Sequence, residues 1–341
     1  MSRTMGFLIS HKNSEKRRAL LPKDMHSIQN VNCLYFESGY GESIGISDTE
    51  YLDAGANIVP REEAMACDIL VDVKVGDADY IQELKSPKIL YGWAHAVQGI
   101  EFTTAVLQGK HTVIAWEEMF EDGRHLFYRN QEIAGEAAVL QAFLHFGRMP
   151  YEARVAVLGS GQTARGAMRV LHGLGARVDV YDRKLEKLFL KRMFDYDVIV
   201  NCVLWDTTRR DRLIYRSDLK KFKKGTMIID VSCNKQLEIE TSVPTTIENP
   251  VYVVDGVIHY VVDNTAALFP VTVSNFISEV LAQTIDCLID GNYSKTIRDA
   301  IVIQDGLIVD QKIACFRESR GMTLPNTQEV ATTGSSVSFG S

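Results

Sequence analysis

The chain has 341 residues, of which 46% are hydrophobic and 24% are charged, and its formal net charge is −7. These values are ordinary for a globular protein with room for two domains. The acidic balance excludes the usual signature of a nucleic-acid or membrane-surface binder. We find no signal-peptide pattern and no apolar run near the roughly 20 residues that span a bilayer. The six cysteines show no C-x-x-C pair or metal-ligand spacing, so we expect reduced thiols, no metal and a cytoplasmic location.

Short apolar runs alternate with helix-like stretches before residue 128. The expected strands are Met5–Ser10, Asn32–Glu37, Ile69–Lys74, Ile89–Trp93 and Thr112–Ala115. The expected helices are Pro22–Gln29, Asp48–Ala54, Asp77–Leu84 and Gln98–Gln108. Ser47 and Glu50 form a capping-box pair before the second helix. Such alternation is typical of a parallel sheet with helices on its faces, so residues 1–128 are predicted to form an α/β domain.

A glycine loop follows the apolar run that starts at Arg154. Gly159 permits a tight turn, Gly161 lets the backbone approach a pyrophosphate, and Ala164 is small enough for the next helix to pack on the strand. The helix N-terminus then offers free N–H groups to phosphates. We therefore predict a dinucleotide-binding Rossmann domain over residues 129–273. Its expected cofactor-binding residues in this loop are Gly159, Ser160, Gly161, Gln162 and Thr163.

The choice of cofactor depends on three residues at the end of the next strand. Asp182 would accept a hydrogen bond from a ribose 2′-hydroxyl and repel a 2′-phosphate, which favours NAD(H). Arg183 and Lys184 adjoin it and could pair with the 2′-phosphate of NADP(H). The residues by themselves leave both cofactors open.

The rest of the second half continues the α/β pattern. Its expected elements are a helix over Glu132–Phe146, buried strands over Asp197–Cys202 and Thr226–Val231, and two strands over Val251–Val254 and Val257–Val262 joined by an Asp255-Gly256 turn. Helical spacing begins at Ser274 and runs to Asp290, and we expect a C-terminal helical segment, residues 274–318, to complete the first domain. Residues 321–341 are rich in Thr, Ser, Gly and Asn, which predicts a disordered tail.

Three segments of the first domain carry candidate chemistry at predicted strand ends, where ligands gather in open α/β sheets. Lys74 could orient an anionic keto acid and polarise its carbonyl, and His95 could exchange a proton near neutral pH. The alternatives are a surface lysine and a structurally bonded histidine. The basic loop after the first strand contains Arg17, whose guanidinium could hold a carboxylate through two bonds, although many charge runs are merely solvated.

These segments together resemble the alanine dehydrogenase and lysine–oxoglutarate reductase family. That family carries E-x-R-x-A-L, a V-x-V-K strand end and an aromatic-x-H strand end, which here read Glu15-Lys-Arg-Arg-Ala-Leu, Val71-Asp-Val-Lys and Trp93-Ala-His. The resemblance covers about residues 5 to 290. It implies two doubly wound domains with parallel sheets, an active site in the cleft between them, and a homo-oligomer, tetramer or dimer. It also implies that Arg17 and Lys74 bind a keto acid and that His95 is the acid/base.

Departures from the alanine dehydrogenase pattern favour the opine-forming branch of this family. The chain has Val73-Lys-Val-Gly where those enzymes read V-K-E-P, and Asn264-Thr-Ala-Ala where they read N-M-P-G. Asn234 stands in place of a family aspartate, and asparagine cannot take a proton. The branch implies NADP(H) rather than NAD(H). Glu117 and Glu132 are the candidates to bind a substrate amine.

The resemblance implies one reaction and leaves two alternatives. In the reaction, NAD(P)H reduces the condensation product of pyruvate with the side-chain amine of ornithine or lysine, giving an N-carboxyethyl amino acid. Alanine dehydrogenase activity, with ammonia as the amine, is the first alternative. A catalytically silent, dinucleotide-sensing protein is the second, because Asn234 removes an acid from the site.

Overall fold

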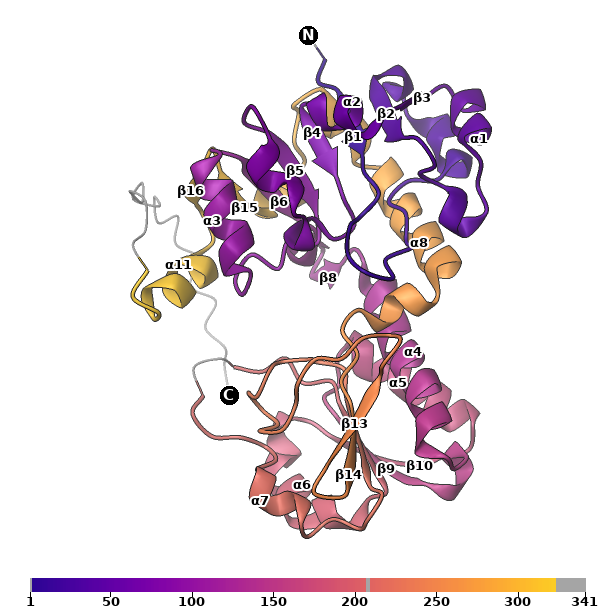
Figure 1. Cartoon of the computed structure of the whole chain (residues 1–341), viewed down its shortest axis with the longest axis vertical. Helices are drawn as coiled ribbons and strands as arrows, with labels where there is room; N and C mark the ends of the chain where they lie inside the picture. Colours follow the sequence, from indigo (N-terminus) through magenta and orange to yellow (C-terminus); the bar gives the residue numbers. More distant parts are fainter. Residues whose placement is uncertain (1, 207–208, 323–341) are drawn as a thin grey trace. The chain divides into compact units, whose positions relative to one another are not determined.

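The computed structural model describes residues 2–206 and 209–322 (Figure 1). The chain divides into two compact units, Met1–Leu126 with Ser278–Ser341, and Phe127–Ile277. We call them unit 1 and unit 2. Disorder is predicted for residues 321–341, and of these residues 323–341 lie outside the described part of the chain. No helix in the described ranges has the length and apolar character needed to cross a membrane.

Unit 1 is built on an eight-stranded sheet of order β16-β15-β6-β5-β4-β1-β2-β3. Its strands are β1 Met5–Phe7, β2 Leu34–Glu37, β3 Asn57–Val59, β4 Ile69–Val71, β5 Ile89–Gly92, β6 Thr112–Ala115, β15 Ile301–Gln304 and β16 Leu307–Ile308. Strands β1 to β6 are parallel. The chain builds outward from β1 to β3 and then returns to β4, so the order reverses between β1 and β4. Ligands of open α/β sheets bind at the carboxyl ends of such a pair.

Helices cover both faces of this sheet because neighbouring strand residues point to opposite sides. Leu90 packs in a core cluster with Phe102 of α3 Ile100–Gln108 and Ile313 of α11 Gln311–Glu318. The next residue, Tyr91, has its hydroxyl 3.1 Å from the hydroxyl of Thr284, on the helical segment at the other face. The remaining helices of unit 1 are α1 Asp48–Asp53, α2 Arg61–Ala66, α9 Ile285–Ile289 and α10 Lys295–Asp299. The helix α8 Pro270–Ala282 spans the boundary between the units.

Unit 2 has a six-stranded sheet of order β10-β9-β11-β12-β14-β13. Its elements are α4 Tyr128–Phe146, β9 Arg154–Leu158, α5 Gln162–Gly173, β10 Arg177–Tyr181, α6 Glu186–Arg192, β11 Val198–Asn201, α7 Arg216–Leu219, β12 Met227–Asp230, β13 Val251–Val254 and β14 Val257–Tyr260. Val155 and Val157 pack with residues of α4 and α5, whereas Ala156 and Leu158 pack with Phe189 of α6. The prediction of two doubly wound α/β domains is therefore confirmed.

Two features of the sheets differ from the sequence prediction. Strands β13, β15 and β16 are antiparallel to their neighbours, so neither sheet is purely parallel. The β13–β14 and β15–β16 hairpins each turn through an Asp-Gly pair with positive φ at both residues: Asp255 (48°) and Gly256 (84°), and Asp305 (50°) and Gly306 (77°). A separate two-stranded hairpin, β7 Phe120–Glu121 and β8 Arg124–His125, turns in the same way at Asp122 and Gly123. Such two-residue turns match the twist of paired strands. The prediction of one helical segment over 274–318 is wrong, because the Asp305-Gly306 turn forms the hairpin of β15 and β16 between α10 and α11.

Short elements also differ from their predicted type. Pro22–Ser27 and Tyr80–Glu83 are 3₁₀ helices rather than α-helices, and the sequence prediction missed β3 and α2. The capping box is present, with the Ser47 N–H donating to Glu50 Oε1 at 2.9 Å.

Candidate active site

The glycine loop follows β9 and leads into α5, as the motif predicts. Gly159 has φ of 105°, and a Cβ there would lie 2.8 Å from the carbonyl oxygen of Cys202, so no side chain fits. Gly161 is the N-cap residue of α5, and nothing lies within 4 Å of its ideal Cβ position. Ala164 is fully buried in the core beneath the sheet. The loop thus leaves room for a phosphate beside a helix N-terminus.

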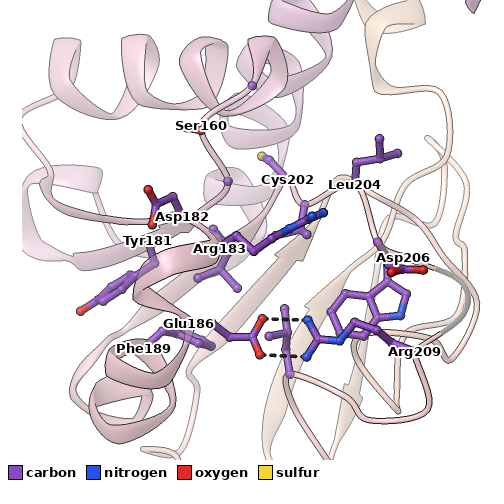
Figure 2. A pocket seen from close by; sticks show the side chains of 16 residues that line it. Ser160, Tyr181, Asp182, Arg183, Glu186, Phe189, Cys202, Leu204, Asp206 and Arg209 are labelled. Atoms are coloured by element: carbon purple, nitrogen blue, oxygen red, sulfur yellow. Dashed lines mark hydrogen bonds and ion pairs between the residues drawn. The ribbon is translucent and has the colours of Figure 1, made fainter. Parts of the chain in front are cut away.

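A pocket of about 470 Å³ opens beside this loop (Figure 2). It lies where β9, β10 and β11 end, and the strand order reverses between β9 and β11, which is the site where doubly wound sheets bind nucleotides. Three of the predicted loop residues line it, and Gln162 and Thr163 do not. The lining residues are Leu158, Gly159, Ser160, Gly161, Tyr181, Asp182, Arg183, Glu186, Phe189, Cys202, Val203, Leu204, Trp205, Asp206, Arg209 and Leu213. The size, position and glycine backbone of this pocket fit a dinucleotide.

The residues predicted to select the cofactor have different roles in the structure. Asp182 Oδ1 accepts the N–H groups of Lys184 and Leu185, both at 3.0 Å, so this carboxylate caps the turn after β10. The side chain of Arg183 lines the pocket, whereas Lys184 does not (Figure 2). Only one of the two predicted cations is therefore placed to meet a bound nucleotide in this pocket.

The far wall of the pocket was not anticipated from the sequence. Arg209 donates to both carboxylate oxygens of Glu186 at 2.8 Å, and Figure 2 shows this ion pair on the pocket wall. The guanidinium carbon of Arg209 lies 4.3 Å from the centroid of the Trp205 ring. The hydrogen bond from Arg209 lowers the pKa of Glu186. These residues come from the loop after β11 and from α6, which no local motif connects.

In unit 1, the structure brings Lys74 and His95 together. Lys74 lies three residues beyond β4 and His95 three residues beyond β5, and these strands are parallel with Val71 opposite Tyr91. Lys74 Nζ lies 3.3 Å from His95 Nε2. Lys74 is buried and the His95 side chain is exposed. A lysine and an imidazole within hydrogen-bond distance can together hold an anion and move a proton.

Two carboxylates hold the backbone at these positions. Asp72 is fully buried, and its Oδ1 accepts the Lys74 N–H at 2.9 Å while its Oδ2 accepts the Tyr80 hydroxyl at 3.2 Å. Burial raises the pKa of Asp72 to about 6. Glu117 accepts the N–H groups of Ala94 and His95. The sequence prediction missed Asp72, although an acidic residue directly after β4 and within the expected strand Ile69–Lys74 could have indicated it.

Arg17, predicted to bind the keto acid, is buried and pairs with a carboxylate of its own loop. It is 2% exposed, and its Nε and Nη2 donate to Glu15 Oε1 at 2.9 Å and Oε2 at 2.5 Å. The guanidinium carbon lies 5.0 Å from the centroid of the Trp93 ring. Glu15 therefore occupies the Nε–Nη2 edge of the Arg17 guanidinium.

Comparison with known proteins agrees with this geometry. Residues 10–130 match the family model "Alanine dehydrogenase/PNT, N-terminal domain", and residues 185–315 match "Alanine dehydrogenase/PNT, C-terminal domain". The chain is 32% identical over 302 residues to N(5)-(carboxyethyl)ornithine synthase of Lactococcus lactis subsp. lactis (strain IL1403), covering 83% of this chain and 97% of that protein. It belongs to the alanine dehydrogenase/PNT family.

Two further similarities fit this assignment. An alanine dehydrogenase of Halomonas elongata is 28% identical, over 90% of this chain and 93% of the relative. A solved structure of L-alanine dehydrogenase superposes with a TM-score of 0.79 at 21% identity, covering 93% of this chain and 99% of that one, which shows the shared fold. Membership of the alanine dehydrogenase/PNT family indicates an oxidoreductase that uses a nicotinamide dinucleotide.

Two predicted substrate residues are engaged inside unit 2 of this alanine dehydrogenase/PNT chain. Glu132 accepts hydrogen bonds from Arg129 and, at 3.4 Å, from Arg169, so it links α4 to α5. This pairing argues against Glu132 as the residue that binds a substrate amine. Asn234 donates through Nδ2 to Glu238 Oε1 at 3.1 Å. A carboxyl group is thus present beside position 234, but it belongs to a residue four positions later.

Proposed function

We propose that the protein is an NADPH-dependent oxidoreductase that joins pyruvate to the side-chain amine of ornithine or lysine. The observation that supports this most directly is the contact of 3.3 Å between Lys74 Nζ and His95 Nε2 at the carboxyl end of a doubly wound sheet. The similarity to N(5)-(carboxyethyl)ornithine synthase over 83% of the chain supports the choice of substrates.

Lys74 and His95 of unit 1 have different roles in the proposed reaction. Lys74 carries the positive charge that holds the keto acid and polarises its carbonyl. The deprotonated amine attacks the carbonyl carbon, and His95 supplies the proton with which the hydroxyl departs as water, giving a protonated imine whose nitrogen keeps one hydrogen. The nicotinamide cofactor, when bound, supplies the hydride that reduces the imine carbon. The product is a secondary amine that carries a carboxyethyl group.

The preference for NADP(H) is supported by the placement of Arg183. Its side chain lines the dinucleotide pocket next to Asp182, whose carboxylate is already an acceptor for two backbone N–H groups. A guanidinium in this position would pair with a 2′-phosphate.

We also propose that the protein forms a homo-oligomer. Leu144 on α4 is 81% exposed and Tyr151, just beyond this helix, is 60% exposed. Exposed apolar side chains that form one contiguous patch are typical of an interface.

Alanine dehydrogenase activity is the second candidate function, favoured by the 28% identity to the Halomonas elongata enzyme. It differs only in the amine, which would be ammonia.

One assay separates these functions. The oxidation of NADPH is followed by its absorbance with pyruvate and, in separate reactions, ornithine, lysine, ammonia or no amine. We expect turnover with ornithine or lysine and little with ammonia. Turnover with ammonia alone would assign alanine dehydrogenase activity. NADPH binding without turnover with any amine would contradict both enzymatic functions and favour a dinucleotide-sensing protein.

A further inference from the structure

The backbone of His95 adopts a conformation that histidine rarely occupies. Its φ is 45°, in the left-handed region that non-glycine residues avoid for steric reasons. A residue stays in such a region only where its surroundings hold it there, and such residues cluster at functional sites. The holding contact should therefore be visible in the structure.

Glu117 makes that contact. Its Oε1 accepts the His95 N–H at 2.5 Å, and its Oε2 accepts the Ala94 N–H at 3.1 Å. Strands β5 and β6 are parallel with Gly92 opposite Ala115, so Glu117 and Ala94 each lie two residues beyond a paired position. The sheet register thus places one carboxylate beside two successive N–H groups of the turn that carries His95.

We propose that Glu117 is a positioning residue that fixes the His95 backbone, so that His95 Nε2 faces Lys74 Nζ, rather than a residue that binds the substrate amine. The importance of this orientation for turnover rests on the proposed function, whereas the contact itself does not. A carboxylate suits the task because two N–H donors need two acceptor oxygens. A glutamine would offer one oxygen and turn its NH₂ group toward the second donor.

The same arrangement recurs at the two other residues predicted to handle the keto acid. Asp72 Oδ1 accepts the Lys74 N–H, and Glu15 Oε1 accepts the Arg17 N–H, both at 2.9 Å. Each of these contacts joins residues two positions apart within one turn, whereas Glu117 reaches His95 from the 3₁₀ turn that follows β6. Fixing the backbone N–H with a carboxylate is therefore a shared feature of this site, and Glu117 is its long-range member.

The neighbouring residue provides a matched control. Glu118 accepts from Lys312 Nζ at 2.8 Å on the surface and lines the same small cavity of about 150 Å³ as His95 and Glu117. Glu118→Gln removes the same charge at nearly the same place without touching the backbone N–H groups of Ala94 and His95.

The test compares Glu117→Gln, Glu117→Asp and Glu118→Gln with the full-length protein. We expect Glu117→Gln to lower kcat by roughly 10- to 100-fold, up to the lower end of the roughly 100- to 10,000-fold that a general acid/base contributes. The Kd for NADPH and the KM for the amine should stay within about twofold of the wild type. Glu118→Gln should leave all of these constants unchanged. The imidazole NMR resonances of His95, assigned with His95→Ala, should shift in Glu117→Gln but not in Glu118→Gln.

Two results would overturn the proposal. A rise in the KM for the amine, with kcat and the His95 resonances unchanged, would make Glu117 a substrate-binding residue. His95 resonances unchanged in both Glu117 variants would show that the contact does not position the ring, and Glu117→Asp keeps this measurement open if Glu117→Gln does not fold. Absence of turnover in the wild type would refute the proposed function, while the NMR comparison still decides the role of Glu117.

Discussion

Two carboxyl groups are buried together beneath the carboxyl ends of β11 and β12. Asp230 and Glu238 are both fully buried, and Asn201 Nδ2 donates to Asp230 Oδ1 at 2.9 Å and to Glu238 Oε1 at 3.0 Å. The Ser242 hydroxyl donates to Asp230 Oδ2 at 2.5 Å. These partners are neutral. Burial, with the charge of Glu238 adding to it, raises the pKa of Asp230 to about 7.

The size and sign of the effect on stability follow from this pKa. The ordinary pKa of an aspartate is 3.8, and that of Asp230 in the folded protein is about 7. At about 1.4 kcal/mol for each tenfold change in proton affinity, this difference corresponds to about 4 kcal/mol in the free energy of unfolding. Because the folded state binds this proton more tightly than the unfolded chain, the contribution of Asp230 to stability is fully present below about pH 4 and is lost as the pH rises through about 7. Asp230→Asn replaces the neutral acid by a neutral amide. We expect it to match the wild type near pH 4 and to be more stable by up to about 4 kcal/mol near pH 8.

Urea unfolding of the wild type and of Asp230→Asn at several pH values measures this difference. Asp179→Asn is the control of opposite sign, because the Tyr196 hydroxyl donates to Asp179 at 2.7 Å and lowers the pKa of Asp179. It should destabilise the protein at neutral pH and have less effect in acid, as its folded pKa is approached. If Asp230→Asn is less stable than the wild type near pH 8, the buried pair is stabilised as an ionised group and the reasoning is wrong.

Three further predictions test the site and its support. His95→Ala should reduce the chemical step by roughly a hundredfold or more without changing NADPH affinity; near-normal single-turnover rates would make the histidine structural. Arg183→Ala should weaken NADPH binding in titrations and leave NADH binding unchanged. Lys184→Ala, at a residue that does not line the pocket, should change neither affinity, and equal effects of the two substitutions would contradict the assignment of Arg183 to the 2′-phosphate. On α5, a Cβ at Gly166 would lie 1.8 Å from a backbone carbonyl of α4, whereas nothing lies within 4 Å of one at Gly173. Gly166→Ala should therefore lower Tm sharply and Gly173→Ala should raise stability by about 1 kcal/mol, and a comparable fall in both would refute this account of the α4–α5 packing.

Local signals explain which parts of the fold could be predicted. The turn at Gly159 depends on residues next to it in the chain, and the strand Thr112–Ala115 has the bounds that its apolar run predicted. The prediction for residues 274–318 failed because the helical spacing of apolar residues ends near residue 290, whereas the predicted helix was continued past the Asp305-Gly306 turn. That turn creates the antiparallel edge strands β15 and β16, and the pairing of β15 with β6 joins residues far apart in the sequence.

In the candidate site, too, local sequence predicts the position of some residues, whereas contacts between distant elements decide the role of others. Lys74 and His95 could be placed at strand ends from sequence alone, and parallel pairing then brings them within 3.3 Å. The role of a carboxylate depends instead on which donors surround it, and these come from other elements. Glu117 meets N–H groups beyond β5, and Glu132 meets an arginine of α5. Both were equally good candidates for an amine-binding residue in the sequence, because charge and residue type are local while hydrogen-bond partners are not. The role assigned to an acidic residue therefore depends on the donors that the structure places around it. Glu117 acts through the backbone of His95, and Glu132 joins the helices α4 and α5.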